Sequence, residues 1–518
     1  MNYTENSVAS RRFLFIYLLV CCIAPALAQT PALRKLQMAE FAITNLYVDK
    51  VDENKLVEEA IIKMLAQLDP HSVYSDAEEV KKMNEPLVGN FEGIGVQFNM
   101  IEDTLLIIQP VSNGPSEKAG ILAGDRIVAV NDTAIAGVKM STEEIMSRLR
   151  GPKDSKVNLT IVRRGVAEPV VFTVKRDKIP IHSLDASYMI QPGTGYIRVN
   201  RFGATTFEEF KQALGDLQKK GMKDLILDLQ GNGGGYLNAS IDMANEFLGP
   251  EELIVYTEGR NSQRSEYFAK GNGTFRKGRL VVLTDEYSAS ASEIVSGAIQ
   301  DWDRGIIVGR RTFGKGLVQR PIDLPDGSMI RLTVARYYTP AGRSIQKPYR
   351  SGLTEGTGAH STDSLKYKTK RLERTVYGGG GIMPDNVIPI DTTLYTDYYR
   401  QLIVKGVILK TIMRYVEKNK GKLLREYKQF NRYLDHFEAG EDLLANMLQL
   451  AGEEKIIFNE EQYTHSLRLI KPQLKALIAR DLWDMSEYFK VINATNESVV
   501  RALELLHSGE YERLLVRK

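Results

Sequence analysis

Two short apolar runs, each followed by a turn of small residues, constrain the fold of this chain more than any other feature. Residues 224–229 and 280–284 are mainly apolar, a pattern typical of strands that are buried on both faces. The first run leads into a glycine-rich turn at 231–235, and the second leads into 288–293, where a helical pattern begins. Strands that alternate with helices indicate a layered α/β core, which we place at 177–395.

Other patterns lie on either side of this core. Apolar residues recur at near-helical spacing between 33 and 70, short β-type runs fill 89–163, and the chain is almost wholly helical from about 396 onward. Residues 348–377 are polar and charged, so we expect an exposed insertion there. The predicted parts are a leader at 1–28, a helical segment at 29–85, a β-rich domain at 86–176, the α/β core at 177–395 and a helical domain at 396–518.

The leader has the pattern of a secretory signal peptide. Arg11 and Arg12 precede an apolar run at 13–24, and Ala26-Leu27-Ala28 follows with the small residues of a cleavage site. We therefore expect export through the Sec pathway, cleavage after Ala28 and a periplasmic location. An uncleaved membrane anchor stays open as an alternative, although the apolar run is short for a membrane span.

Cysteine usage limits the chemistry of the mature chain. Both cysteines, Cys21 and Cys22, lie in the predicted leader, so a chain that begins near Gln29 has none. This excludes disulfides, a cysteine metal site and a cysteine nucleophile. The pair raises a lipoprotein alternative, but Leu19 and Val20 lack the small residue expected just before a lipidated cysteine.

Charge and histidine patterns give no sign of nucleic-acid or metal binding. The net charge is only +3, and the basic residues form no sustained stripe. The six histidines do not cluster, and we interpret His71 and His182 as structural. The glycine-rich turn does not satisfy Gly-x-Gly-x-x-Gly, because Tyr236 follows where a third glycine is needed, so we expect no nucleotide site.

Ser290 is the candidate nucleophile. It follows the run at 280–284 and precedes a helix, and such a turn presents a hydroxyl at the edge of a sheet. The free N–H groups and the dipole at a helix N-terminus favour the negative charge of a tetrahedral oxyanion. Taken alone, Ser290 and Glu293 could also form a structural capping box. Ser288 and Ser292 remain alternative nucleophiles.

Several segments together resemble the C-terminal processing peptidases, which are also called tail-specific or carboxyl-terminal proteases (peptidase family S41). The resemblance covers roughly residues 35 to 390 and implies a crotonase-like, layered α/β peptidase core. It also implies that Ser290 is the nucleophile, that Lys315 is the general base, that Gln319 orients the lysine, and that no cofactor or metal is needed. The matching segments are 68–71, 288–294, Gly314-Lys315-Gly316 with Gln319, 339–346 and 379–385.

The residues around Lys315 agree with a role of this lysine as general base. An ordinary lysine has a pKa of about 10.4 and is protonated at neutral pH, so a lysine base needs apolar surroundings that lower its pKa. We expect Phe313, Leu317 and Val318 to supply them. If the segment is helical, Gln319 shares a face with Lys315. A neutral amide holds the amine without raising its pKa as a carboxylate would.

The oxyanion needs a second donor from another loop. The resemblance implies a backbone N–H in an Asn-x-Pro-Gly-Gly loop, which corresponds here to residues 230–235. Gly233 stands where proline is usual, and this leaves the free loop more flexible. We assign the oxyanion hole to the N–H groups of Gly234 and Ala291.

The β-rich domain at 86–176 resembles a PDZ domain. The matching pieces are the Gly93-Ile94-Gly95-Val96 loop, 115–120 and 123–127. The resemblance implies that the amides of Gly93, Ile94, Gly95 and Val96 bind the terminal carboxylate of a substrate, whose chain adds as a β-strand. Since Ile94 and Val96 are apolar, we expect substrates with free C-termini that end in small or branched apolar residues.

The sequence thus predicts an exported serine endopeptidase that captures C-terminal tails and cuts through an acyl-enzyme. Its expected partners are peptides and proteins and no nucleic acid, while peripheral membrane association and a homo-oligomer stay open. One rival interpretation is a catalytically inactive PDZ scaffold. The other is acyl-CoA chemistry on a crotonase-like core, against which the PDZ domain and the leader both argue.

Overall fold

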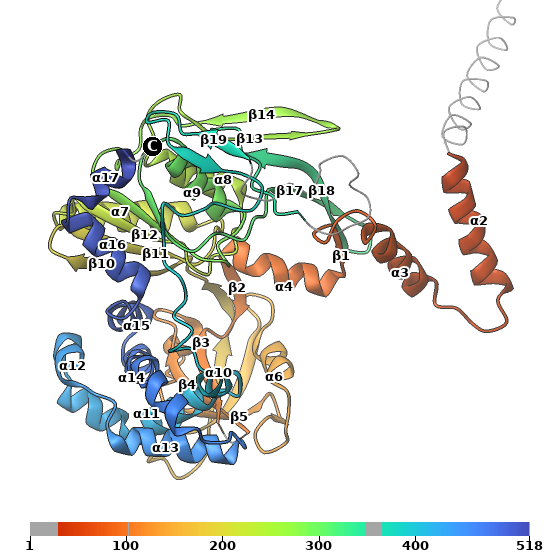
Figure 1. Cartoon of the computed structure of the whole chain (residues 1–518). Coiled ribbons are helices and arrows are strands. Elements are labelled where there is room, and N and C mark those ends of the chain that lie inside the picture. The colour runs from red at the N-terminus through yellow and green to blue at the C-terminus, as the bar shows by residue number, and fades with distance from the viewer. Residues whose placement is uncertain (1–29, 102, 349–364, 517–518) are drawn as a thin grey trace, which may run out of the picture. The chain divides into compact units, whose positions relative to one another are not determined.

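The computed structural model describes residues 30–101, 103–348 and 365–516, and Figure 1 shows its elements along the chain. The predicted signal peptide lies outside the described residues. The described chain divides into two units: one comprises 30–76 with 321–332, and the other comprises 77–320, 333–348 and 365–516.

Side-chain caps begin both helices of the smaller unit. The oxygens of Thr30 and Asp52 accept N–H groups in the first turns of α2 (Pro31–Leu46) and α3 (Glu53–Leu65). A short strand, β1 (Val73–Ser75), follows and pairs antiparallel with Met329–Arg331. Most of the residues expected to be helical at the N-terminus therefore lie in these two helices.

Alternating apolar residues give the first part of the larger unit a small β-domain. Its antiparallel sheet has the strand order β3-β4-β5-β7-β8, with β6 paired to β5, and β2 pairs separately with β9. Leu105, Ile127 and Leu159 are fully buried in its core, together with Ile145 from α6. The elements are α4 (Ala77–Val88), β2 (Asn90–Gly93), β3 (Val96–Ile101), β4 (Thr104–Pro110), α5 (Pro115–Lys118), β5 (Arg126–Val130), β6 (Thr133–Ala134), α6 (Thr142–Leu149), β7 (Lys156–Val162), β8 (Val170–Lys175) and β9 (Asp177–Pro180).

The expected α/β core contains a sheet with the strand order β10-β11-β12-β15-β16-β21. β10 is antiparallel to β11, and the later pairs are parallel. Every residue of β12 and β15 is buried, as expected for parallel strands covered on both faces. The elements are β10 (Leu184–Gln191), β11 (Thr194–Val199), α7 (Thr206–Lys219), β12 (Asp224–Asp228), α8 (Leu237–Asn245), β15 (Leu280–Thr284), α9 (Ala291–Asp301), β16 (Ile306–Gly309) and β21 (Asn386–Val387).

Successive residues of the core strands point to opposite faces, and each face has its own apolar cluster. Leu225, Leu227 and Val282 belong to the cluster that also contains residues of α7, α8 and α9. Ile226 and Val281 belong to a second cluster, which includes residues of α16 (Glu497–His507) and α17 (Glu510–Val516). Figure 1 shows these two C-terminal helices, in dark blue, beside the core strands. The last part of the predicted helical domain thus covers one face of the α/β-core sheet.

The predicted exposed insertion differs in part from the structure. Residues 349–364 lie outside the described residues, but β19 (Lys366–Lys368) and β20 (Thr375–Tyr377) form a two-stranded sheet. Between them Arg374 is buried, and it donates hydrogen bonds to the carboxylates of Asp303 at 2.7 Å and Asp385 at 2.6 Å. Most of residues 365–373 are exposed, but the expectation of an exposed insertion is wrong for Arg374, because two carboxylates bind its guanidinium.

A further hairpin and a mainly helical region complete the larger unit. β13 (Leu253–Gly259) pairs with β14 (Ser262–Phe268) and, through Tyr256 and Thr257, with the last residues of β18 (Met329–Tyr338). β17 (Leu317–Asp323) also pairs with β18. The helices that precede α16 share one apolar core, rich in aromatic residues. They are α10 (Asp397–Val404), α11 (Val407–Glu426), α12 (Phe430–His436), α13 (Glu441–Glu453), α14 (Glu460–Leu482) and α15 (Met485–Ile492).

The predicted fold class is confirmed: a layered α/β core occurs with a β-rich domain and with helices at both ends of the described chain. None of the helices in the described ranges combines the length and apolar character that crossing a membrane requires.

Candidate active site

Ser290 lies at the turn from β15 into α9, in a backbone conformation that is rare for a residue with a side chain. Its φ is 56° and its ψ is −112°, and such a conformation persists only where surrounding contacts hold it. The neighbouring serines supply two of these contacts. The Ser288 hydroxyl donates to the Leu229 carbonyl at 2.8 Å, and the Ser292 hydroxyl donates to the Asn232 carbonyl at 2.9 Å. Both alternative nucleophiles are therefore buried and engaged by the backbone.

The glycine-rich turn packs directly against the Ser290 turn. Gly234 has a φ of 99°, and a Cβ built on it would lie 2.7 Å from the Ser290 Cβ and 3.0 Å from the Ala291 nitrogen. Only glycine fits there without a shift of the backbone. In this conformation the Gly234 N–H donates to Asn232 Oδ1 at 2.9 Å. Ala291 is the first residue of α9, so no carbonyl within the helix accepts its N–H.

Lys315 and Gln319 lie together, although not on a helix. Lys315 Nζ donates to Gln319 Oε1 at 3.1 Å. The possible helical arrangement does not occur, because residues 317–323 form strand β17 and Gly314 before it has a φ of 90°. Of the expected apolar neighbours, Leu317 is buried, Val318 is partly buried, and Phe313 is 48% exposed.

Glu293 links the turn that carries Ser290 to the segment that carries Lys315. Its Oε2 accepts the N–H of Ser290 at 2.8 Å and the N–H of Lys315 at 2.9 Å. Its Oε1 accepts the Thr312 hydroxyl at 2.6 Å and the Gly314 N–H at 2.8 Å. The side chain is fully buried. Burial raises the pKa of Glu293 above its ordinary value, although the four donors oppose the rise.

The Glu293 contacts go beyond the capping box that the sequence suggested. The Ser-x-x-Glu pattern accounts only for the bond to the Ser290 N–H. The bonds to Thr312, Gly314 and Lys315 join segments that are far apart in sequence, so local spacing gives no signal for them. A single oxygen atom, Glu293 Oε2, thus binds the backbone N–H groups of both Ser290 and Lys315.

Comparison with known proteins shows which families this chain is similar to. Residues 193–355 match the family model "Peptidase family S41", and residues 93–178 match "PDZ domain". The carboxy-terminal processing protease CtpB of Bacillus subtilis is 37% identical over 332 residues, which cover 62% of this chain and 68% of that protein. The carboxy-terminal-processing protease of Bartonella bacilliformis is 38% identical over 320 residues, which cover 60% of this chain and 73% of that protein.

The chain belongs to the carboxy-terminal processing proteases of peptidase family S41.

Two more segments of this carboxy-terminal processing protease match family models. Residues 24–79 match "Activating protease CtpB N-terminal domain", and residues 398–484 match a family of unknown function. Among solved structures, the photosystem II D1 C-terminal processing protease is 32% identical and covers 61% of this chain and 91% of its own, with a TM-score of 0.35. Ser290, Lys315 and Gln319 all lie within the segment that matches the S41 model.

In the PDZ domain of this protease, the expected carboxylate-binding loop joins β2 to β3. The Ile94 carbonyl accepts the N–H and the hydroxyl of Ser116, at 3.0 and 2.7 Å. Gly95 has a φ of 70°, and a Cβ on it would lie 2.8 Å from Ile179 Cδ1. Ile94 is buried in the PDZ core, so its side chain does not flank an open pocket as expected. Gly93 ends β2, and the half-buried Val96 begins β3.

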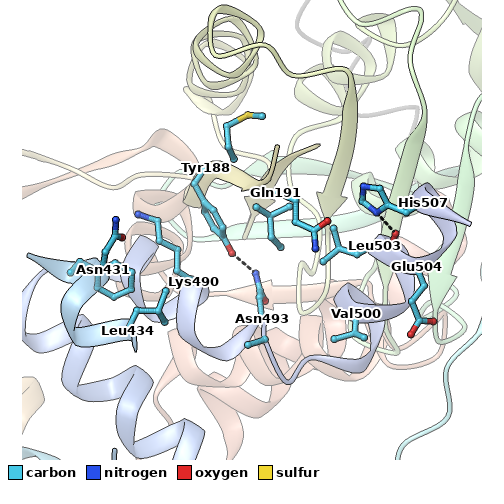
Figure 2. A pocket seen from close by; sticks show the side chains of 14 residues that line it. Tyr188, Gln191, Asn431, Leu434, Lys490, Asn493, Val500, Leu503, Glu504 and His507 are labelled. Carbon is cyan, nitrogen blue, oxygen red and sulfur yellow. Dashed lines mark hydrogen bonds between the residues drawn. The ribbon is translucent and has the colours of Figure 1, made fainter. Parts of the chain in front are cut away.

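A separate hollow in the protease contains none of the predicted site residues. It has a volume of about 840 Å³ and lies between β10 and residues of α12, α15 and α16. Figure 2 shows the Asn493 amide pointing to the Tyr188 hydroxyl, to which it donates at 2.9 Å. Within the described ranges, no cluster of three histidine, cysteine, aspartate or glutamate side chains could hold a metal ion. His182 is exposed, with Nδ1 3.7 Å from Glu209 Oε2.

Proposed function

We propose that this carboxy-terminal processing protease cuts peptide bonds with a Ser290–Lys315 dyad. Ser290 Oγ attacks the scissile carbonyl carbon while neutral Lys315 Nζ takes the hydroxyl proton. The carbon–nitrogen bond of the tetrahedral intermediate then breaks, Lys315 returns the proton to the leaving amine, and an acyl-enzyme remains. Water hydrolyses this ester, again with Lys315 as the base. The observation that carries the proposal is the shared bond of the Ser290 and Lys315 N–H groups to Glu293 Oε2.

The oxyanion of each tetrahedral intermediate is assigned to two backbone donors. The Ala291 N–H stands at the N-terminus of α9, where the helix dipole also favours negative charge. The Gly234 N–H is the second donor, and it must turn from Asn232 Oδ1 toward the substrate when the loop closes on it. Gln319 orients the lysine amine through the bond to its Oε1.

Substrate selection is assigned to the PDZ domain. The amides of Gly93–Val96 would bind a free terminal carboxylate, and the tail would add as a strand beside β3. The half-buried Val96 at the start of β3 supports an apolar last residue in the substrate. Capture of the tail would raise the local concentration of the scissile segment at Ser290.

The leader pattern supports export to the periplasm, where the enzyme would meet exported proteins as substrates. N-terminal sequencing of the mature protein tests this part. We expect a first residue of Gln29, and an intact Met1 would contradict it. Fractionation of the cells shows whether the mature protein associates with the membrane, and sedimentation shows whether it forms a homo-oligomer.

Catalysis is tested with a quenched fluorescent peptide and purified full-length variants. Ser290→Ala and Lys315→Ala should each abolish turnover, and the double variant should be little worse, because the two residues act as one unit. Lys315→Arg should also be inactive, since guanidinium does not give up its proton. A fluorophosphonate should label the wild type on Ser290, located by mass spectrometry.

The comparison variant is Ser292→Ala, which removes one of the contacts that hold the Ser290 turn, so it should lower turnover in part but keep fluorophosphonate labelling on Ser290. Loss of labelling in Ser292→Ala, with labelling retained in Ser290→Ala, would move the nucleophile to Ser292. A folded wild type that neither cuts peptides nor reacts with the probe would favour the inactive scaffold.

A further inference from the structure

The segment that carries the lysine base, Gly314–Lys315–Gly316, has no regular secondary structure of its own. It lies just before β17, and Gly314 is in a left-handed conformation. A glycine-flanked loop of this kind gains its order from bonds made by other parts of the chain. The position of Lys315 Nζ relative to Ser290 therefore depends on what holds these three peptide groups.

The N–H groups of the segment are all bound by side chains. Glu293 accepts those of Gly314 and Lys315, at 2.8 and 2.9 Å. Gln346 Oε1 accepts that of Gly316 at 2.9 Å. Gln346 ends the segment 339–346, one of the stretches that carried the family resemblance and to which no catalytic role was given.

The carbonyl groups of the segment are bound as well, two of them by a single residue. The Tyr337 N–H donates to the Gly316 carbonyl at 3.0 Å, and the Tyr337 hydroxyl donates to the Lys315 carbonyl. The Lys347 N–H donates to the Gly314 carbonyl at 2.8 Å. From β18, the Tyr337 side chain thus binds the carbonyl group of Lys315 itself.

Tyr337 also lies at the centre of the site. Its side chain is buried, and its hydroxyl lies beside the side chain of Ser290. Burial, together with the nearby Glu293 carboxylate, raises the pKa of the Tyr337 phenol far above its ordinary value, so the hydroxyl remains a donor at every pH at which the enzyme works. While the hydroxyl stays protonated, it keeps its hydrogen bond to the Lys315 carbonyl.

We propose that Tyr337 and Gln346 are positioning residues for the Lys315 base. They hold the lysine's peptide groups so that Nζ reaches the Ser290 hydroxyl, and they do not themselves exchange protons with the substrate. The inference rests on the proposed Ser290–Lys315 dyad and extends it. A base displaced by about 1 Å lowers the rate roughly 100-fold even when the substrate still binds.

The test compares Tyr337→Phe with Tyr338→Phe in the full-length enzyme. Phenylalanine keeps the ring and removes only the hydroxyl. Tyr338 is the matched control, because it is the next residue of β18 and its ring stacks on Tyr256, with centroids 4.9 Å apart. We expect Tyr337→Phe to lower kcat and the rate of fluorophosphonate labelling by about 10- to 100-fold, with KM within about twofold. Tyr338→Phe should leave both rates unchanged.

A second variant makes the test independent of how well Tyr337→Phe folds. Gln346→Met keeps the length of the side chain but removes the acceptor for the Gly316 N–H, and it should lower kcat and labelling in the same direction. Wild-type labelling rates in Gln346→Met and in folded Tyr337→Phe, with Ser290→Ala inactive, would overturn the inference and leave the dyad standing. Full turnover in Ser290→Ala would instead overturn the proposed function itself.

Discussion

Replacing Gly234 by alanine tests the packing of the glycine-rich turn against the turn that carries Ser290. The new methyl group would lie 2.7 Å from the Ser290 Cβ, 2.8 Å from the Ala289 carbonyl oxygen and 3.0 Å from the Ala291 nitrogen. All three atoms belong to the turn that presents Ser290. Two of the three are backbone atoms, so no side-chain rotation relieves the contact.

Two effects set the expected loss of unfolding free energy in Gly234→Ala. A residue with a side chain pays about 1–2 kcal/mol for a left-handed conformation such as the φ of 99° at Gly234. Overpacking a close contact costs a further ~1–3 kcal/mol. We therefore expect the free energy of unfolding to fall by about 2–5 kcal/mol. If the loop shifts to relieve the contact, its N–H leaves the oxyanion position, and loss of one such donor lowers kcat roughly 100- to 1000-fold.

Gly233→Ala is the matched control, one residue away on the same loop. A Cβ there has no neighbour within 4 Å, and its backbone lies outside the left-handed region. Peptide cleavage at saturating substrate gives kcat, and urea unfolding gives stability. Gly233→Ala should change neither by much. Wild-type kcat and stability in Gly234→Ala would refute the packing argument, whereas lost stability with full kcat would refute only the oxyanion role.

Three further predictions concern charge and recognition. Glu293→Gln should lower kcat roughly 100-fold, because its amide NH₂ would face the N–H groups of Gly314 and Lys315, which are themselves donors. Burial raises the pKa of Glu293, so wild-type activity should fall on acidification at a higher pH than an ordinary glutamate would give. The pH profile of Glu293→Gln should lack this acidic fall. Arg343→Met should lower the unfolding free energy by about 3–5 kcal/mol in urea, since it leaves the buried Asp301 carboxylate without its cation. Amidation of a substrate's C-terminus should raise KM in the wild type but have little effect in Gly95→Ala, whose methyl group would contact Ile179; equal KM values for free and amidated tails in the wild type would contradict tail capture.

The short-range part of the site could be predicted from the sequence. A motif with fixed spacing pointed to Lys315 and Gln319, and the structure places the lysine amine 3.1 Å from the glutamine oxygen. The suggested helix under them does not occur, because Gly314 and the pairing of β17 with β18 give this segment a loop and a strand. The predicted contact between Lys315 and Gln319 thus occurs, although the helix suggested to produce it does not.

The long-range part could not be predicted. The bonds of Glu293 to Thr312 and Lys315 join residues whose separation in sequence follows no local period. Phe313 looked like an apolar shield because only its residue type was known, whereas its exposure depends on the surrounding fold. Likewise, the apolar stripe of α16 predicted a helix but not that Val499 and Leu505 pack on the core sheet.

The packing of α16 and α17 on the core sheet has a consequence for the order in which the enzyme matures. Ribosomes release a chain from its N-terminus onward, so the strands that support Ser290 emerge well before residues 497–516. Until those residues arrive, one face of the sheet, including Ile226 and Val281, stays in water. A nascent or prematurely terminated chain would thus hold Ser290 on a sheet with one apolar face uncovered. A chain that lacks α16 and α17 should therefore have a less stable core sheet beneath Ser290.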